Sequence, residues 1–263
     1  MVAFTTMDRD HIIHAVQAMY TDVACAPGND YHFPVGREAC LALGYAAEWL
    51  DEIPDTAVES FAGVACPVQG DVFRVGDTVL DIGSGSGTDS LIAALRVGNQ
   101  GRVYCLDMTD AMLNKLGSNI EKLGITNLVR LRGNAEVIPL PDQSVDIITS
   151  NGVLNLVPDK PKVFAEMFRV LRPGGRITIS DISVSKDLKT LEEARDNPRL
   201  WAECVAGAVT DEDYLAELGN AGFKELKVID ELDYFSHSIS ENTRQIATNF
   251  GAHSIVLRGV KPD

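Results

Sequence analysis

The sequence lacks any long apolar run. No window approaches the roughly 18 consecutive apolar residues that a membrane-spanning helix needs, so we expect no membrane partner. The first twenty residues, MVAFTTMDRDHIIHAVQAMY, carry acidic side chains and lack the apolar core of a signal peptide. The cysteine pattern described next adds the expectation of a reducing, cytoplasmic location.

Cysteine pairs are also lacking. The chain has an odd number of cysteines and no Cys-x-x-Cys motif; they are Cys25, Cys40, Cys66, Cys105 and Cys204. This spacing excludes a secreted disulfide framework and a structural zinc site. No other cluster of metal ligands stands out, so we expect free thiols and no catalytic metal ion.

Basic residues are scarce. The 263 residues include 23 Lys and Arg against 38 Asp and Glu, a net charge of -15. Nucleic-acid binding requires Lys and Arg to replace phosphate counterions. We therefore expect no nucleic-acid partner.

What the sequence does have, from Asp77 onward, is an alternation of short apolar strands and amphipathic helices. Strands are predicted at 78–83, 102–108, 128–135, 144–151 and 176–182, and helices at 89–98, 111–124 and 160–171. Strands separated by helices predict a parallel sheet with right-handed crossovers. Residues 183–222 read as mainly helical, with substrate-binding insertions, and 227–235 and 254–260 as two late antiparallel strands.

The N-terminal part has a different pattern. Residues 8–20 predict a helix, with apolar residues at helical spacing, 21–36 a loop, and 37–51 a second helix. We expect residues 1–70 to form a helical cap or lid over a domain at 71–263. The stretches 21–36 and 57–68 are expected to be mobile without substrate, since lids must open for exchange.

The strongest motif is the glycine-rich loop at 81–87. It follows a strand, opens a helix, and contains Asp81, Gly83, Ser84, Gly85 and Gly87. Glycines let the backbone turn tightly and approach a ligand closely. The loop lacks the Lys-Ser/Thr of a P-loop, which argues against phosphate cradling. Asp81 suits a ligand's ammonium group better than a pyrophosphate, although the loop alone leaves a dinucleotide open.

Further polar residues follow the next strands. Asp107 ends the second strand, where a carboxylate can accept hydrogen bonds from ribose hydroxyls. Asn134, in the sequence Gly133-Asn134-Ala135-Glu136 after the third strand, can read an adenine edge. Open α/β sheets bind ligands at the carboxyl ends of their strands. The predicted cofactor-binding set is completed by Met108, Ala135, Glu136 and Asn151.

Taken together, the acidic G-x-G-x-G loop, Asp107, GNAE (133–136) and RVLRPGGR (169–176) resemble class I S-adenosylmethionine methyltransferases. That resemblance implies a Rossmann-like α/β fold with a mostly parallel seven-stranded sheet, and S-adenosylmethionine as cofactor. A second set of phrases is similar to the arsenite methyltransferase family over nearly the whole chain: YHFPVG (31–36), LGY (43–45), AVESFAGVACP (57–67), GSGSGTD (83–89), DMTDAML (107–113), SNGVLNLVPDK (150–160) and WAECVAGAV (201–209).

This second resemblance implies an arsenic site. In that family trivalent arsenic is held by cysteine thiolates in segments resembling SNCV and ECVGGA, with a third nearer the N-terminus; thiolates are soft ligands that suit a thiophilic metalloid. Cys204 matches the ECVGGA position, whereas Gly152 stands where SNCV has its cysteine. Cys66 falls near the N-terminal position, with Cys25 as a third candidate. Cys66 and Cys204 are thus possible arsenic ligands, or simply small buried side chains; Cys40 and Cys105 read as core.

Two alternatives stay open at this point. The first is methylation of a small organic molecule at O, N or C, with Gly152 giving room for a carbon skeleton, His32 or Glu203 as general base and Tyr31 lining the pocket. The second is a protein that binds the cofactor without turnover. A requirement for thiols separates arsenite from an organic acceptor.

Overall fold

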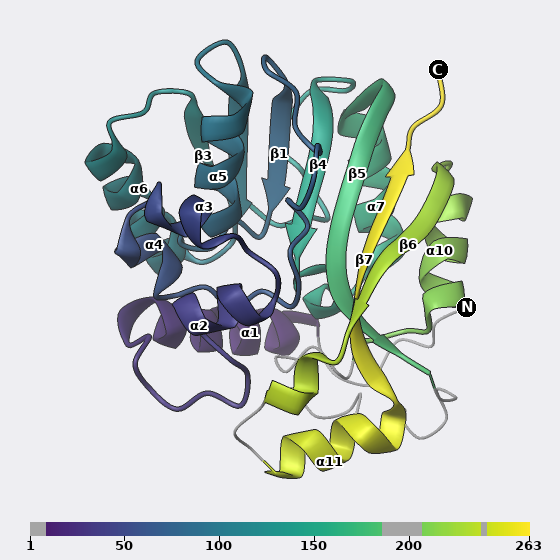
Figure 1. The fold of residues 1–263 in the computed structure, drawn as a ribbon. Helices are drawn as coiled ribbons and strands as arrows, with labels where there is room; N and C mark the ends of the chain where they lie inside the picture. Colours follow the sequence, from purple (N-terminus) through teal and green to yellow (C-terminus); the bar gives the residue numbers. More distant parts are fainter. Residues whose placement is uncertain (1–8, 186–206, 238–240) are drawn as a thin grey trace.

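One seven-stranded sheet runs through the computed structural model, which describes residues 9–185, 207–237 and 241–263 (Figure 1). The strands are β1 (Thr78–Ile82), β2 (Arg102–Asp107), β3 (Leu128–Arg132), β4 (Val145–Asn151), β5 (Leu171–Val184), β6 (Lys224–Leu232) and β7 (Ala252–Val260). Their order is β3-β2-β1-β4-β5-β7-β6, and β7 runs antiparallel to the other six strands. The predicted α/β class and mostly parallel sheet are confirmed.

Helices cover both faces of this sheet. They are α5 (Thr88–Val97), α6 (Asp110–Leu123), α7 (Lys160–Val170) and α10 (Asp211–Asn220), while η3 (Tyr234–His237) and α11 (Glu241–Phe250) connect β6 to β7. One apolar cluster lies under α5, α6 and the N-terminal segment, and a second lies under α7 and α10. Strands covered on both faces are apolar throughout, as the burial of Val79, Leu80 and Ile82 in β1 shows.

The N-terminal segment, residues 9–70, contains four helices and is called the cap below. They are α1 (Arg9–Cys25), α2 (Arg37–Ala42), α3 (Ala47–Asp51) and α4 (Asp55–Val58). Figure 1 shows them gathered at the end of the sheet toward which the arrowheads of β1 and β4 point. The cap therefore lies at the carboxyl ends of the parallel strands, where the sequence places the ligand.

Several predicted boundaries were wrong. The helix expected at 37–51 is two helices, because Gly44 between them has a φ of 90°, which no helix tolerates. The strand expected from 176 begins at Leu171, which pairs with Val145 across a bulge. The strand expected to reach 135 ends at Arg132, since Asn134 turns the chain by accepting a hydrogen bond from the Glu136 N–H. The first helix extends to Cys25.

The stretch 57–68 is packed into the domain rather than forming the expected mobile loop. Ala57 O accepts hydrogen bonds from Ser86 Oγ (2.7 Å) and Thr88 Oγ1 (3.0 Å), and Pro67 O accepts one from Thr178 Oγ1 (2.8 Å). Most of its side chains are buried. Such packing opposes local opening. Of the stretch 21–36, the first five residues belong to α1, and the mobility of that stretch stays a prediction.

No described helix combines the length and the apolar character needed to cross a bilayer. Of the expected helical insertion at 183–222, residues 186–206 lie outside the described part of the chain, and the rest contributes the end of β5 and α10.

Candidate active site

A pocket opens at the carboxyl ends of β1, β2 and β4, underneath α1. Its walls come from the glycine-rich loop, the segments after β2, β3 and β4, and the cap. Among the lining residues are Ile13, Val16, Tyr20, Ser60, Phe61, Ala62, Gly63, Asp81, Gly83, Ser84, Gly85, Asp89, Asp107, Met108, Asn134, Ala135, Asn151, Gly152, Val153 and Leu156. The structure thus brings most of the predicted cofactor-binding residues together around one space.

The glycine-rich loop needs its glycines. Gly83, Gly85 and Gly87 have φ values of 74°, 51° and 104°, in the region that side chains disfavour. A Cβ on Gly83 would also overlap the Val153 side chain. The loop is fixed from below, because the Leu106 carbonyl accepts hydrogen bonds from the N–H groups of Gly83 (2.7 Å) and Ser84 (3.1 Å). These contacts hold the backbone against the pocket.

Asp107 lies at the end of β2 and faces this loop. Its Oδ2 accepts a hydrogen bond from the Gly85 N–H (2.9 Å) and its Oδ1 one from the Thr109 N–H (2.8 Å). Burial raises the pKa of the Asp107 carboxyl above its usual value, although these N–H donors oppose that shift. The next residue, Met108, also lines the pocket, and its carbonyl accepts a hydrogen bond from Gln17 of α1 (3.0 Å).

Two further acids lie side by side beneath the loop. Asp81 accepts hydrogen bonds from Ser90 Oγ (2.5 Å) and Thr149 Oγ1 (2.7 Å), and burial raises its pKa to about 6. Asp89, in the first turn of α5, has a pKa raised to about 7, by burial and by the charge of Asp81. Sequence reasoning missed Asp89; an acid directly after the last glycine of the loop was the available signal.

Asn151 links the pocket to the cap. Its Oδ1 accepts a hydrogen bond from the Val64 N–H (2.8 Å), and its Nδ2 lies within hydrogen-bond distance of Ala65 O (2.9 Å), Tyr45 OH (3.0 Å) and Asp89 Oδ2 (3.0 Å). Asn151 lines the pocket, and these contacts run from it to the cap and to α5. They hold the cap against the end of β4, and its contact with a cofactor stays a prediction.

Glu136, the last residue of the predicted adenine-binding segment, is buried away from the pocket lining. It forms an ion pair with Arg9 at the start of α1, and its Oε1 has no hydrogen-bond partner among the described residues. The neighbours Asn134 and Ala135 do line the pocket. Glu136 therefore ties α1 to the segment after β3.

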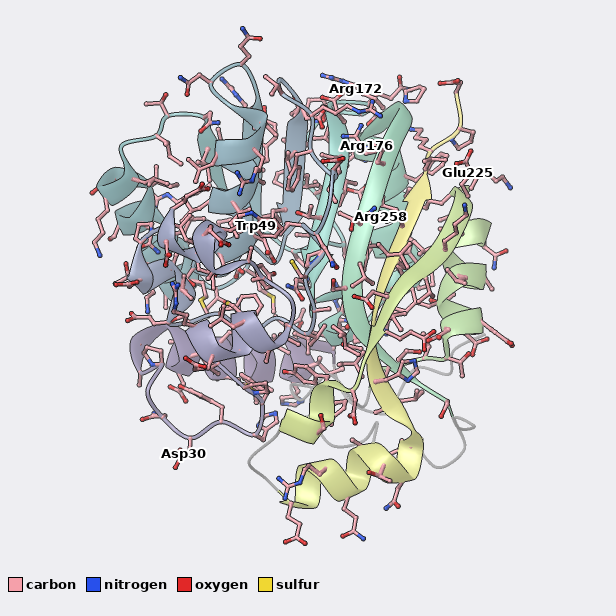
Figure 2. All side chains as sticks on the ribbon, viewed as in Figure 1. Asp30, Trp49, Arg172, Arg176, Glu225 and Arg258 are labelled. Carbon is pink, nitrogen blue, oxygen red and sulfur yellow. The ribbon has the colours of Figure 1, made fainter. Side chains whose placement is uncertain are left out.

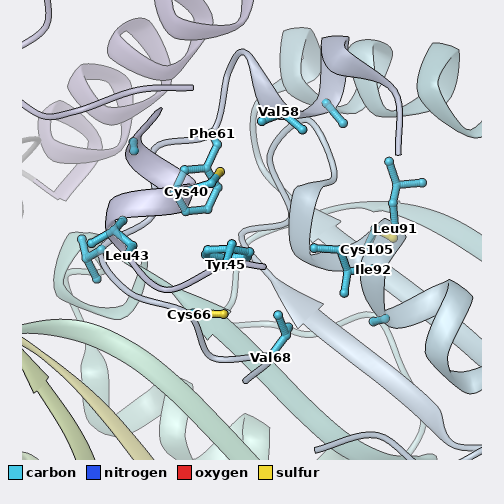
Figure 3. Packing of buried hydrophobic residues seen from close by; sticks show 14 of the residues in the cluster. Cys40, Leu43, Tyr45, Val58, Phe61, Cys66, Val68, Leu91, Ile92 and Cys105 are labelled. Carbon is cyan, nitrogen blue, oxygen red and sulfur yellow. The ribbon is translucent and has the colours of Figure 1, made fainter. Parts of the chain in front are cut away.

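The predicted thiols lie in different places. Cys66 is 2% exposed and packs beside Tyr45 and Val68 in the cap (Figure 3); it is not among the pocket-lining residues. Burial, with a smaller contribution from Asp89, raises the pKa of its thiol. Cys25 is exposed at the end of α1. Cys40 and Cys105 are core residues, as predicted. Cys204 lies outside the described residues, and so does Glu203.

The aromatic loop of the cap does not reach the pocket lining. His32 packs edge-on against Phe33 (4.6 Å between ring centroids), and Tyr31 donates a hydrogen bond to Ala26 O (2.9 Å). Tyr20, on α1, lines the pocket instead. Sequence reasoning missed Tyr20 because helical spacing showed which face of α1 was apolar but not what it covers.

Gly152 lines the pocket directly after Asn151. Its φ is 70°, and a Cβ built on it would lie 3.2 Å from Cγ1 of Val64. The Val64 side chain thus fills the direction that a side chain at position 152 would take. Within the described residues, no group of three His, Cys, Asp or Glu side chains is arranged to hold a metal ion.

Comparisons of this chain with known proteins find methyltransferases. A family model described as a methyltransferase domain matches residues 74–227. The arsenite methyltransferase of Halobacterium salinarum is 38% identical over 188 residues, 71% of this chain and 47% of that protein. The ubiquinone/menaquinone biosynthesis C-methyltransferase of an Enterobacter species is 36% identical over 151 residues, 55% of this chain and 59% of that protein. The matched part spans about half the length of these curated relatives.

A solved structure extends the match. The crystal structure of an arsenic(III) S-adenosylmethionine methyltransferase from Chlamydomonas reinhardtii superposes with a TM-score of 0.67 at 30% identity, covering 87% of this chain and 75% of that one. The similarity thus includes the cap as well as the sheet. The chain belongs to the methyltransferase-domain family and, within it, to the arsenite methyltransferases.

Proposed function

We propose that this protein transfers a methyl group from S-adenosylmethionine to trivalent arsenic. The observation that supports the cofactor most directly is the glycine-rich loop, hydrogen-bonded through Gly85 to Asp107 across the pocket. The acceptor is proposed from the arsenite methyltransferase relatives and from Cys204 in its WAECVAGA segment.

The residues present fit S-adenosylmethionine. Ser84 Oγ lines the pocket, is buried, and has no hydrogen-bond partner among the described residues, so a ligand atom would satisfy it. Asp107 supplies carboxylate oxygens for ribose hydroxyls, and Asn134 supplies a side-chain amide for an adenine edge. Gly83 and Gly85 leave the backbone open to close approach.

When bound, S-adenosylmethionine supplies an electrophilic methyl group on a sulfonium. The protein's part is to position the reactants and exclude water. α1 does this by placing Ile13, Val16 and Tyr20 over the pocket, and it is held there by Gln17 and by the Arg9–Glu136 pair. Methylation of arsenic uses the lone pair of As(III), so it requires no general base in the protein.

The thiol set for arsenic is reduced compared with the family pattern. Gly152 offers no ligand, and Cys66 would have to leave its packed position beside Tyr45 to reach the pocket. Cys204, with Cys66 or the exposed Cys25, remains the proposed ligand set. A soluble thiol such as glutathione would complete the coordination.

One observation favours an organic acceptor as the second candidate. Ala62, Gly152, Val153 and Leu156 line the pocket, which gives it an apolar wall. An apolar carbon skeleton fits such a wall, and the similarity to a C-methyltransferase points the same way. On this hypothesis Glu203 or His32 would act as general base.

Labelled methyl transfer to arsenite, with glutathione present, separates the two candidates. We expect wild-type turnover that is lost in Cys204→Ser, with S-adenosylmethionine affinity unchanged. Cys25→Ser and Cys66→Ser then show which second thiol is used, with thermal unfolding as the control for the buried Cys66. Wild-type cofactor binding without arsenite turnover would instead support an organic acceptor. A cytoplasmic location is part of the same proposal, since free thiols require a reducing compartment.

A further inference from the structure

The buried acids of this protein differ in what neutralises them. Outside the pocket each has a cationic neighbour: Asp77 pairs with Arg176, Glu136 pairs with Arg9, and Lys160 lowers the pKa of Asp181 against the effect of burial. A buried carboxylate without a countercharge is strongly disfavoured, and these pairs remove that penalty.

The pocket acids lack this compensation among the described residues. Asp81 is satisfied by hydroxyls, Asp107 by backbone N–H groups, and Asp89 by Tyr45 OH (2.5 Å) and Asn151 Nδ2 (3.0 Å), all of them neutral donors. No Lys, Arg or His side chain is among the pocket-lining residues of the described chain. Three carboxylates therefore face one space that supplies them with no positive charge.

The groups around the two deeper acids are uncharged or acidic. The groups that hydrogen-bond to Asp89 or interact with its charge are Tyr45, Cys40 and Cys66 of the cap, Asn151 of β4 and Asp81 of β1. The corresponding groups around Asp81 are Ser90, Thr149, Cys105, Asp107 and Asp89. Ser84 Oγ, buried and unpartnered in the same pocket, indicates that a ligand completes this wall. The complementary ligand is a cation.

We propose that Asp89, with Asp81, provides the countercharge for the sulfonium of the cofactor, so that the pocket selects the charged sulfonium cofactor over its neutral thioether product. This rests on the proposed use of S-adenosylmethionine. The cofactor carries a sulfonium, an ammonium and a carboxylate, whereas S-adenosylhomocysteine keeps only the ammonium and the carboxylate and is neutral overall. An attraction between Asp89 and the sulfonium is therefore lost with the methyl group, and it favours exchange of product for fresh cofactor.

The test is the affinity of the purified full chain for both molecules, by isothermal titration calorimetry at pH 8. We expect Asp89→Asn to weaken S-adenosylmethionine about tenfold, as loss of one partly buried charge interaction would, and S-adenosylhomocysteine by less than about twofold. The matched control is Asp30→Asn, at the outer edge of the cap (Figure 2), which should change neither affinity.

A second variant separates charge from structure. Tyr45→Phe removes a hydrogen bond to Asp89 but keeps the carboxyl group, so at pH 8 it should weaken S-adenosylmethionine less than Asp89→Asn does. If Asp89→Asn weakens both ligands equally, or neither, Asp89 does not select by charge and the inference is overturned while the proposed function stands.

Wild-type protein gives an independent readout if Asp89→Asn fails to fold. Its preference for S-adenosylmethionine over S-adenosylhomocysteine should increase from pH 6 to pH 8, as the pocket carboxylates lose their protons. A preference that is constant with pH contradicts the inference. Failure of wild type to bind either ligand overturns the proposed function and this inference together.

Discussion

Gly152, directly after β4, lies against Val64 of the cap: a Cβ on the glycine would lie 3.2 Å from Cγ1 of the valine. The glycine also has a φ of 70°, where any side chain is strained. The backbone at this position is fixed by its neighbour Asn151, whose side chain binds Val64 and Ala65. A cysteine at position 152 would therefore keep a strained φ and require a shift of the Val64 side chain.

We predict that Gly152→Cys lowers the free energy of unfolding by about 2 kcal/mol, through a strained φ and displacement of Val64. Gly152→Ala should cause most of the same loss, because it shares the φ and the Cβ. Combining Gly152→Cys with Val64→Ala should destabilise less than the sum of the single changes, since the second change removes the contact. Urea unfolding of wild type, the three single variants and the double variant measures this; strict additivity in the double variant would contradict the contact.

Two glycines of the glycine-rich loop allow a controlled comparison of alanine substitutions. Gly83 and Gly85 both have positive φ, but a Cβ on Gly83 would overlap Val153, whereas one on Gly85 would have only Met112 Sδ nearby, at 3.9 Å. We expect Gly85→Ala to cost about 1 kcal/mol of stability, and Gly83→Ala about 1–3 kcal/mol more from overpacking. Gly83→Ala should also weaken S-adenosylmethionine about tenfold. Equal effects of the two variants in thermal unfolding and calorimetry would contradict this difference.

Sequence patterns predicted the sheet well because each strand is a short apolar run between turn signals, as TVLDIG (78–83) illustrates. They also placed Asp81, Asp107 and Asn134 at one edge, since parallel strands end together. They failed where tertiary contacts decide. Nothing local shows that Glu136 turns toward Arg9, 127 residues away, rather than toward the pocket.

In the cap, too, sequence patterns could not predict contacts between segments that are distant in the chain. Cys66 was placed near a family cysteine by its position along the chain, but its burial beside Tyr45 follows from packing of segments distant in sequence. Asp89 was missed because an acid in the first turn of a helix is ordinarily explained by the helix dipole. Only its burial, and hydrogen bonds from Tyr45 and Asn151, mark it as part of the pocket.

The pocket acids also predict how stability depends on pH. The folded pKa values of Asp81 and Asp89, about 6 and about 7, lie above the ordinary 3.8. The folded state then holds more protons than the unfolded state between about pH 4 and pH 7, so the free energy of unfolding falls as pH rises through that range. Asp181, also at about 6 through burial, adds to this slope. Glu166, whose pKa is lowered by Arg169, contributes stability that is lost only at acidic pH.

Melting temperatures of the cofactor-free protein between pH 4.5 and pH 8 test this dependence. We expect a decline with rising pH that is shallower in Asp89→Asn, since the amide does not titrate. The slope left in the variant comes from the other carboxyls whose pKa burial raises, namely Asp81, Asp107, Asp181 and Glu217. Identical slopes in the two proteins would show that Asp89 does not titrate in this range.

The Arg9–Glu136 pair allows a test of how α1 is held. The Glu136 side chain is 0% exposed and that of Arg9 is 44% exposed, so removing the arginine leaves a buried carboxylate without its cation. We expect Arg9→Ala to lower the free energy of unfolding by about 1–3 kcal/mol. It should also speed release of S-adenosylmethionine, because Ile13, Val16 and Tyr20 on the same helix cover the pocket.

Glu136→Gln is the partner variant, since it removes the buried charge and keeps the shape. The double variant Arg9→Ala/Glu136→Gln should be more stable than Arg9→Ala alone, because the orphaned charge is gone. Glu136→Gln alone should leave equilibrium cofactor affinity within about twofold of wild type, since Glu136 lies outside the pocket lining. A large loss of affinity in that variant, at unchanged stability, would return Glu136 to the cofactor-binding set. Urea unfolding and stopped-flow release of the cofactor give both quantities on the same four proteins.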